Sequence, residues 1–358
     1  MSPSAPVARR RNALQSSLGL GEKLFASSDE RRFVDALEQG LEKVEAGLVA
    51  EMSFADDIAD VTARYLLDAG GKRVRPTLTL LTAQLGEGNN DDVVRAAMAI
   101  EITHLASLYH DDVMDEAQMR RGVPSAQTVW GNSVAILTGD LLFARASVLG
   151  AKLGERVLDL QARTFERLVL GQLHETIGPR PDEDRIDHYI GVLADKTGSL
   201  IAAAAQVGVI FSNAPQEYDE PVRVFGEKIG VAFQLIDDVI DLSSRVDETG
   251  KSAGTDLRAG VATLPMLYLR EQALIDSDAD DLVRRLDRDT TAAFYGEGDD
   301  AEFAAAVEQL REHPVTQRTL DEAHRWSREA VEALAPLPAG PVKKALTRFA
   351  EAIVERSS

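Results

Sequence analysis

The chain of 358 residues contains no cysteine, which excludes disulfide bonds, thiolate metal sites and cysteine nucleophiles. Aromatic residues make up only 5% of the sequence while Ala and Leu abound, a mixture that favours helices over sheets. Basic residues are outnumbered 39 to 59, and the formal net charge of −20 argues against a nucleic-acid partner, because phosphate backbones bind basic patches. A small phosphorylated ligand is not excluded, since it responds only to local charge. No uninterrupted apolar run reaches about 18 residues, so we expect no transmembrane segment.

The first 21 residues carry Arg9, Arg10 and Arg11, several serines, and no acidic residue before Glu22. This composition fits a transit peptide, but a flexible basic tail is the simpler interpretation. The segment has no apolar core suited to a secretory signal. We therefore expect a tail over residues 1–27, one all-α domain over residues 28–358 and a cytoplasmic location.

From about residue 28 onward the apolar residues recur with the period of a helix and show no convincing alternation of a strand. Residues 92–119 are apolar nearly all round, which predicts one long helix in the middle of a bundle. Four further helices are expected, over 134–153, 156–177, 184–211 and 222–243. The segments between them are short and rich in Gly or Pro, and none resembles a domain linker. The pattern predicts a single large helical bundle.

An acidic motif of the form D-D-x-x-D occurs twice, as HDDVMD over residues 110–115 and as IDDVID over residues 236–241. Residues four apart on a helix share a face, so the first and last aspartates of each motif point the same way, with the middle one beside them. Other paired aspartates, such as Asp56-Asp57, lie in polar contexts and read as solvated surface. The two motifs differ because they have apolar residues inside them and continue apolar helices.

Facing carboxylates must be neutralised, and hard oxygen ligands of this kind suit magnesium, which keeps several waters and also binds phosphate oxygens. If the two acidic helices lie across a bundle core, their carboxylates face one another. The sequence therefore predicts a magnesium site. Its candidate ligands are Asp111, Asp112, Asp115, Asp237, Asp238 and Asp241.

Basic residues beside glycines bracket the acidic motifs. The turn G-G-K-R-V-R-P over residues 70–76 brings two arginines and a lysine together, and arginine suits bidentate phosphate recognition. One cation near a glycine is usually a solvated loop residue, but several of them in a chain of this charge suggest a diphosphate–magnesium site. The histidine of the first long helix lies seven residues before Asp111, on the same face. The candidates are Lys72, Arg73, Arg75, His104, Arg120, Arg121, Lys196 and Lys251.

Six segments together resemble the successive signatures of the trans-prenyltransferases, the all-trans polyprenyl diphosphate synthases. In chain order they read GGKRVRP, EITHLASLYHDDVMDEAQMRRG, GDLLFARA, DKTGSL, FQLIDDVID and TGKSAGTDL. The resemblance runs from about residue 60 to 270. It implies an all-helical fold of the isoprenoid synthase type with a central cavity, a homodimer, and magnesium-dependent head-to-tail condensation of isopentenyl diphosphate onto an allylic diphosphate.

The resemblance also implies a role for each matching residue. The six aspartates would bind magnesium, as three ions, together with the allylic diphosphate. Contacts to that diphosphate would come from Lys196, Lys251 and Arg120. Isopentenyl diphosphate would be held by Lys72, Arg75, His104 and Arg121. Thr197 and Gln234 match positions near the developing carbocation, and Gln172 lies on a helix that faces the cavity.

Product length follows from the residues just before the first acidic motif. In the family a bulky residue four or five positions before the motif stops chain growth early. Here Ala106 and Ser107 occupy those positions, with Thr103 a further turn away, and all are small. We therefore expect a product longer than twenty carbons, a precursor of a quinone side chain such as that of menaquinone, released with peripheral membrane contact.

Three alternatives remain. The first is a shorter-chain farnesyl or geranylgeranyl diphosphate synthase, and the choice between it and a long-chain synthase rests on Ala106 and Ser107. A terpene cyclase shares the fold and the first acidic motif, but usually carries a different second motif and lacks GGKRVRP. A non-catalytic subunit of a heteromeric synthase tends to lose the acidic motifs, and both are intact here.

Overall fold

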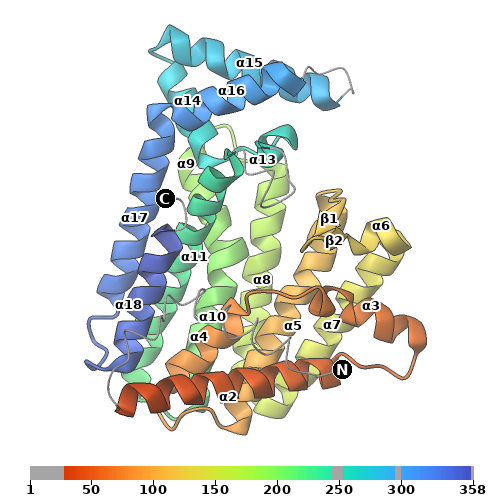
Figure 1. Cartoon of the computed structure of the whole chain (residues 1–358), viewed down its shortest axis with the longest axis vertical. Helices are drawn as coiled ribbons and strands as arrows, with labels where there is room; N and C mark the ends of the chain where they lie inside the picture. The colour runs from red at the N-terminus through yellow and green to blue at the C-terminus, as the bar shows by residue number, and fades with distance from the viewer. Residues whose placement is uncertain (1–27, 244–252, 295–299, 356–358) are drawn as a thin grey trace, which may run out of the picture. The chain divides into compact units, whose positions relative to one another are not determined.

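A computed structural model describes residues 28–243, 253–294 and 300–355, and most of these residues lie in helices (Figure 1). The all-α prediction is confirmed. Contacts divide the chain into two compact units. Among the described residues, unit 1 comprises 28–168, Ser199–Glu227 and Ala330–Ala352, and unit 2 comprises Val169–Gly198, 228–243, 253–294, 300–329 and 353–355. One domain over residues 28–358 remains a prediction.

Unit 1 contains the N-terminal helices, one short hairpin, and parts of later helices. Its complete elements are α2 (Ser28–Glu51), α3 (Asp57–Asp68), α4 (Val74–Ala83), α5 (Asp91–Met114), β1 (Met119–Arg120), β2 (Val123–Pro124), α6 (Ala126–Trp130), α7 (Asn132–Leu153), α10 (Ser199–Phe211) and η3 (Gln216–Tyr218). It also includes the first parts of α8 (Glu155–Ile177) and α11 (Asp219–Asp241) and most of α18 (Pro341–Val354).

Unit 2 contains the second part of α8 and α11 and the helices that follow them. Its other elements are α9 (Arg185–Leu193), the π-helical segment η2 (Ala194–Gly198), α13 (Thr255–Arg258), α14 (Leu264–Ala273), α15 (Ser277–Phe294), α16 (Asp300–Glu312) and most of α17 (Pro314–Ala333). Buried leucines and aromatic residues such as Leu235, Leu269 and Phe303 fill its interior.

Helix α5 is the central helix of unit 1 and packs against α2, α4, α7 and α10. Asn90 caps its start, where the side chain accepts hydrogen bonds from the amides of Asp92 and Val93. Most of its residues are buried, as the apolar pattern predicts. The neighbouring helix α4 is fastened to α10 by Thr79, whose hydroxyl donates to the Ala204 carbonyl at 2.7 Å.

The long helix expected over residues 92–119 ends at Met114, so its last five residues are wrongly predicted. Glu116 takes a left-handed backbone conformation, which a helix cannot continue through. The chain then folds into a hairpin that pairs Arg120 with Val123 around the two-residue turn Arg121–Gly122. Both turn residues have positive φ, 53° and 78°, as a tight two-residue hairpin turn requires.

The helix expected over residues 184–211 is three elements: α9, the π-helical η2 and α10. A π turn contains an extra residue, which hydrophobic spacing does not reveal. Gly171 on α8 allows this segment to approach in unit 2, because a Cβ at that position would lie 2.7 Å from the Lys196 amide nitrogen. Lys196 and Thr197, both predicted site residues, belong to the π turn.

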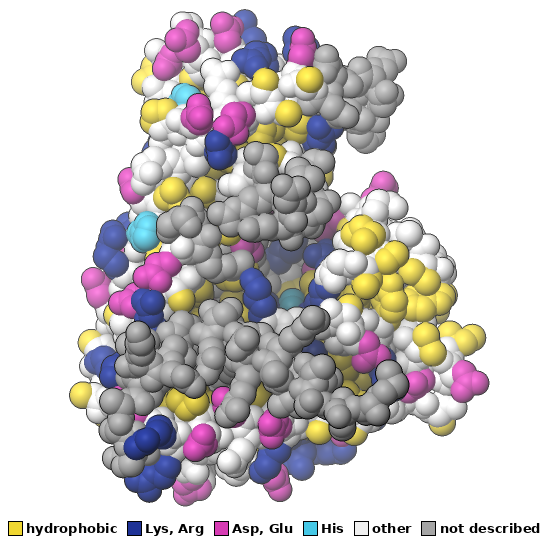
Figure 2. All heavy atoms as spheres, viewed as in Figure 1, with side chains coloured by type: hydrophobic (Ala, Val, Ile, Leu, Met, Phe, Trp, Pro, Cys, Tyr) yellow, Lys and Arg dark blue, Asp and Glu magenta, His cyan; other side chains and the backbone are white. Residues whose placement is uncertain are grey.

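Helix α7 is long and apolar enough to cross a membrane, and it is the one such helix among the described residues. Ala135, Leu142 and Ala146 are buried within unit 1, as in a core helix of a globular protein. Other apolar side chains stay exposed: hydrophobic residues gather on the surface of unit 1 near α6 and the hairpin (Figure 2), where Met119 and Val129 are exposed.

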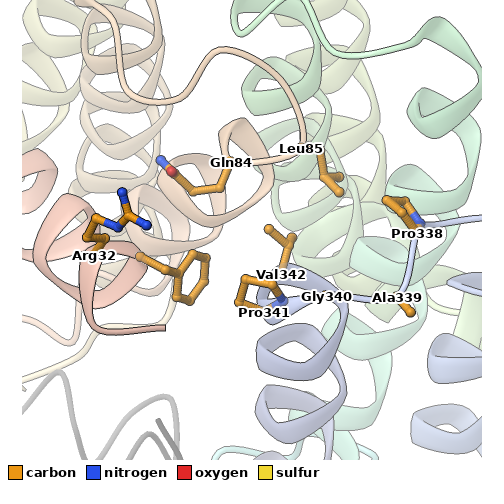
Figure 3. Close-up of a pocket in the computed structure, with 9 residues that line it drawn as sticks. Arg32, Gln84, Leu85, Pro338, Ala339, Gly340, Pro341 and Val342 are labelled. Atoms are coloured by element: carbon orange, nitrogen blue, oxygen red, sulfur yellow. The ribbon is translucent and has the colours of Figure 1, made fainter. Parts of the chain in front are cut away.

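A pocket of about 490 Å³ lies in unit 1 beside the start of α2 and the start of α18 (Figure 3). Arg32 and Gln84 are its polar lining residues, and Phe33, Pro341 and Val342 supply apolar walls. No residue predicted to bind substrate or metal lines this pocket. The described residues with predicted chemistry lie in two other places, one in each unit.

Candidate active site

The first acidic motif lies at the end of α5 in unit 1, where its three aspartates differ in burial. Asp112 is fully buried, Asp111 is half-buried, and Asp115 is exposed at the helix C-cap. Arg120 Nε donates to Asp112 Oδ1 at 2.6 Å. Burial raises the pKa of Asp112, and the charge of Arg120 opposes that rise. Arg120 reaches the motif from β1 and not from a continued helix, so the predicted neighbourhood occurs by a different path.

The carboxylates of this motif suit a hard divalent cation. Asp112 Oδ2 is buried and accepts no hydrogen bond from any described residue, so one acceptor here is unsatisfied. Within the described residues, no three acidic or histidine side chains converge closely enough to hold a metal alone. Such a partial set of oxygen ligands fits magnesium, which retains water and takes phosphate oxygens as ligands.

An arginine cluster forms beside the glycine turn of residues 70–76, also in unit 1. Arg121 Nη1 donates to the carbonyls of Leu66, at 2.7 Å, and Gly70, which end helix α3. Gly70 and Gly71 have φ of 99° and 152°, and a Cβ on Gly71 would lie 2.7 Å from Arg73 Nη1. Glycine at position 71 therefore lets the guanidinium groups lie directly against the backbone.

The two arginines of the glycine turn have different surroundings. Arg73 forms ion pairs with Glu45 and Glu101. Arg75 Nε is buried and, among the described residues, has no hydrogen-bond partner. Burial lowers the pKa of Arg75 to about 10, with Glu101 opposing the shift, so this guanidinium stays charged at neutral pH. A buried cation with an unfilled donor is suited to an anionic ligand.

His104 on α5 is neutral at physiological pH. Burial, followed by the charges of Arg75, Arg121, Arg120 and Arg73, lowers its pKa well below 6.5. A neutral imidazole still offers one N–H donor, so it can bind an anion oxygen without adding charge. Glu101, one turn earlier on α5, is a buried carboxylate that sequence reasoning missed; the only signal was an acidic residue on a strongly apolar helix.

The three residues predicted to control product length are all buried on α5. Ala106 is fully buried, and Thr103 and Ser107 are nearly so. The Thr103 hydroxyl donates to the Ala99 carbonyl at 2.9 Å, and the Ser107 hydroxyl donates to the His104 carbonyl at 2.8 Å. Because the helix itself satisfies both hydroxyls, these side chains present mainly carbon to their surroundings.

An apolar cluster of unit 1 lies toward the N-terminal end of α5, away from the acidic motif. It joins α5 to α8 and α10, and the sequence patterns did not identify it. Its buried members are Ala96, Ile100, Leu168, Leu200, Ala203, Ala204 and Val207, with Leu153, Leu160 and Phe211 packed against them.

The second acidic motif lies at the end of α11 in unit 2. Asp238 is buried, and its Oδ2 accepts from the Tyr189 hydroxyl at 2.6 Å and from the Leu264 amide at 3.2 Å. Burial raises the pKa of Asp238 to about 8, and these two hydrogen bonds oppose the rise. Asp241 Oδ2 accepts from the Asp256 amide at 3.1 Å. No sequence pattern indicates Tyr189 as a partner of this motif.

The π-helical segment brings two predicted catalytic residues near other polar groups of unit 2. Lys196 Nζ forms an ion pair with Glu175 Oε2, and Thr197 Oγ1 lies 3.5 Å from Gln234 Oε1. Gln172 Oε1 is buried without a hydrogen-bond partner among the described residues. Lys251 lies outside the described residues. The assigned roles of all these residues remain predictions.

Known proteins resemble this chain along nearly its whole length. The family model for polyprenyl synthetases matches residues 56–293. A nonaprenyl diphosphate synthase of Mycobacterium tuberculosis is 43% identical over 347 residues, which are 94% of this chain and 96% of that protein. A polyprenyl synthase of Caulobacter crescentus, solved with calcium and isoprenyl diphosphate, has a TM-score of 0.82 and 31% identity over 92% of this chain and 98% of its own. A geranylgeranyl pyrophosphate synthase of Corynebacterium glutamicum, also solved with calcium and isoprenyl diphosphate, has a TM-score of 0.76 and 40% identity over 93% of this chain and 99% of its own.

Proposed function

Because the chain belongs to the polyprenyl synthetase family, we propose that it is a long-chain all-trans polyprenyl diphosphate synthase that extends an allylic diphosphate with isopentenyl diphosphate. Family membership makes it a prenyltransferase and implies a divalent metal cofactor. The observation that carries the proposal is the cluster of unit 1 in which Arg75, with an unfilled donor, lies near His104 and the Arg120–Asp112 pair.

We assign the arginine cluster to isopentenyl diphosphate. Lys72, Arg75 and Arg121 supply the positive charge that its diphosphate needs, and neutral His104 supplies a further donor. Charged guanidiniums and a neutral imidazole hold the substrate still without transferring a proton to it. Holding the double bond near the second substrate removes much of the entropic cost of the bimolecular step.

The allylic diphosphate is assigned to the acidic motifs, with Arg120, Lys196 and Lys251 as its cationic contacts. When bound by these carboxylates, magnesium, proposed here as three ions, supplies positive charge that stabilises the charge on the leaving diphosphate. The carbonyl oxygen of Gln234 and the hydroxyl of Thr197 offer partial negative charge to the allylic cation. Apolar helix walls exclude water, which would quench that cation.

The reaction balances without a protein base. The allylic C–O bond breaks and its electron pair leaves with the diphosphate. The double bond of isopentenyl diphosphate supplies the pair for the new C–C bond. A proton then leaves the isopentenyl unit and passes to the departing diphosphate.

We propose a product longer than twenty carbons because Thr103, Ala106 and Ser107 place only small side chains before the first acidic motif. The M. tuberculosis relative is named for a nonaprenyl product and supports this length. The C. glutamicum relative is named for a geranylgeranyl product and keeps a shorter-chain synthase as the second candidate. A menaquinone side chain, a cytoplasmic location and a homodimer complete the proposal, and exposed Met119, Val129 and Leu137 support the homodimer.

The test uses purified protein, magnesium, radiolabelled isopentenyl diphosphate and either farnesyl or geranylgeranyl diphosphate, with products sized by chromatography. Extension beyond twenty carbons, lost when EDTA removes the metal, is expected. If no primer is extended, the assignment as a synthase is refuted. A product of twenty carbons or fewer would refute only the long chain. A cyclic hydrocarbon formed from the primer alone would indicate a terpene cyclase.

A further inference from the structure

Glu101 is a carboxylate buried in the middle of a cationic cluster in unit 1. Its side chain is 2% exposed, and Arg73 Nη1 donates to its Oε1 at 3.3 Å. Burial raises the pKa of Glu101, and the charges of Arg73, Arg75 and Arg121 oppose that rise. A buried carboxylate that forms ion pairs offsets the repulsion between arginines, which otherwise drives them apart.

Arg73 is held by protein groups through every nitrogen of its guanidinium. Nε donates to Glu45 on α2, and Nη1 donates to Glu101 on α5 and to the Gly70 carbonyl at 3.4 Å. Nη2 donates to the Leu67 carbonyl at 3.3 Å at the end of α3. These contacts join α2, α3 and α5 to the glycine turn, and they leave Arg73 poorly placed to donate to a substrate.

The backbone at Arg73 is also unusual, since its φ of 50° and ψ of 37° lie in the left-handed region at the N-cap of α4. A non-glycine residue keeps this conformation only when surrounding contacts enforce it. The four acceptors of the Arg73 side chain are such contacts. Arg75 follows two residues later, so the direction of its side chain depends on the backbone that Arg73 fixes.

We propose that Glu101 and Arg73 are positioning residues for the isopentenyl diphosphate site: they hold the glycine turn and its arginines so that Arg75 and Arg121 present their donors to the diphosphate. The inference rests on the proposed function. It gives the two arginines of one motif opposite tasks, since Arg73 binds protein and Arg75 binds substrate.

Two substitutions test the pair. Glu101→Gln keeps the shape and removes the charge, and Arg73→Lys keeps the charge but cannot reach the acceptors on α2, α3 and α5 together. For each variant we expect the KM for isopentenyl diphosphate to rise about tenfold, equivalent to ~1.4 kcal/mol, while the KM for the allylic primer changes less than about twofold. In the double variant, the KM for isopentenyl diphosphate should be no higher than in the single variant with the higher KM, because both substitutions disrupt the same Arg73–Glu101 pair.

Arg167→Lys is the matched control, because Arg167 pairs with Glu227 in unit 1 and neither residue is a predicted site residue. It should leave both KM values unchanged. Binding of isopentenyl diphosphate alone, measured by calorimetry without primer, should weaken in the two test variants only. Thermal unfolding by circular dichroism verifies that each variant is folded; if Glu101→Gln does not fold, Arg73→Lys decides by the same criteria.

An unchanged KM for isopentenyl diphosphate in a folded variant would overturn the inference, and so would equal increases for both substrates, which indicate general loss of structure. These failures are distinct from failure of the proposed function. In that case the unmodified chain would incorporate no isopentenyl diphosphate at all.

Discussion

Tyr189 is the side chain that fixes the buried carboxylate of the second acidic motif. Its hydroxyl donates to Asp238, and burial together with the charge of Asp238 raises the pKa of Tyr189 well above its usual value, so it remains a donor at all physiological pH values. The same carboxylate oxygen accepts from the Leu264 amide. One oxygen of Asp238 is therefore committed to protein donors on α9 and at the start of α14.

Replacing Tyr189 with Phe removes the stronger of these donors and leaves a buried acceptor poorly satisfied. We expect the free energy of unfolding to fall by about 1–3 kcal/mol. We also expect a higher magnesium concentration at half-maximal activity, because Asp237 and Asp241 lose a fixed neighbour. Urea unfolding and magnesium titration measure the two effects. Tyr218→Phe in η3, an element without predicted site residues, should change neither.

His104 makes the stability of the chain depend on pH. Its pKa is lowered well below 6.5 in the folded state by burial and by neighbouring arginines, so between these two values only the unfolded state takes up the proton. The contribution of His104 to the free energy of unfolding is therefore fully present above pH 6.5. It declines as the pH falls, by up to ~1.4 kcal/mol per pH unit.

His104→Gln should flatten that decline. The midpoint of urea unfolding, followed at pH 8, 7, 6 and 5.5 without ligands, should fall more steeply in the unmodified chain than in the variant. His324→Gln on α17 serves as the comparison. Parallel pH profiles for the unmodified chain and His104→Gln would mean that His104 is protonated in the folded state.

Helix α5 combines the acidic motif at its C-terminal end with the apolar cluster near its N-terminal half. Ala106 lies between the two, fully buried. Ala106→Phe should shorten the product, because a ring fills the space that a growing chain needs, and should lower stability by about 1–3 kcal/mol through overpacking. Chromatography of the products tests the first effect. Unchanged length in a folded variant would place the limit on another helix.

The converse substitution is Ile100→Ala, within the apolar cluster further along α5. Removing three carbons costs about 2–5 kcal/mol in a packed core, and the cavity it leaves should admit additional isoprene units. A longer product distribution would locate the limit in this cluster. Leu286→Ala, a buried site of α15 in unit 2, is the control for destabilisation alone.

The sequence patterns predicted which segments are helical, because the apolar residues of α8 and α11 recur with a helical period and the segment of α5 is long and apolar nearly all round. They did not predict where α5 ends, since that depends on the left-handed backbone of Glu116. The π turn was equally invisible, because one extra residue hardly alters a hydrophobic period. Of the site, the motifs gave Asp112, Arg120 and Arg75, whereas Glu101 and Tyr189 could not be found: each acts through a partner distant in sequence.

The whole chain carries a net charge of −20, so its cationic clusters are local exceptions in an acidic protein and are held together by local contacts. We therefore expect metal and diphosphate to stabilise the folded chain more when they bind together than when either binds alone. Magnesium and inorganic pyrophosphate together should raise the unfolding temperature more than pyrophosphate alone, because the acidic motifs bind a diphosphate only together with metal, whereas the arginine cluster binds one without it. Differential scanning fluorimetry with calcium, magnesium and EDTA measures the effect. Equal stabilisation by pyrophosphate with and without metal would contradict metal-dependent binding.

The π turn at Ala194–Gly198 has a consequence for insertions and deletions. Removing one residue there would let residues 185–211 wind as a single regular α-helix, and the helix faces on either side would keep their orientation because the π turn already accommodates the extra residue. Most deletions inside a helix disrupt folding, but this one removes an irregularity. It should yield a folded protein that has lost the Lys196–Glu175 and Thr197–Gln234 contacts, a separation-of-function allele created without changing any side chain that remains. In an alignment of related sequences, a one-residue gap at this position would therefore mark chains that fold alike but have given up this part of the chemistry.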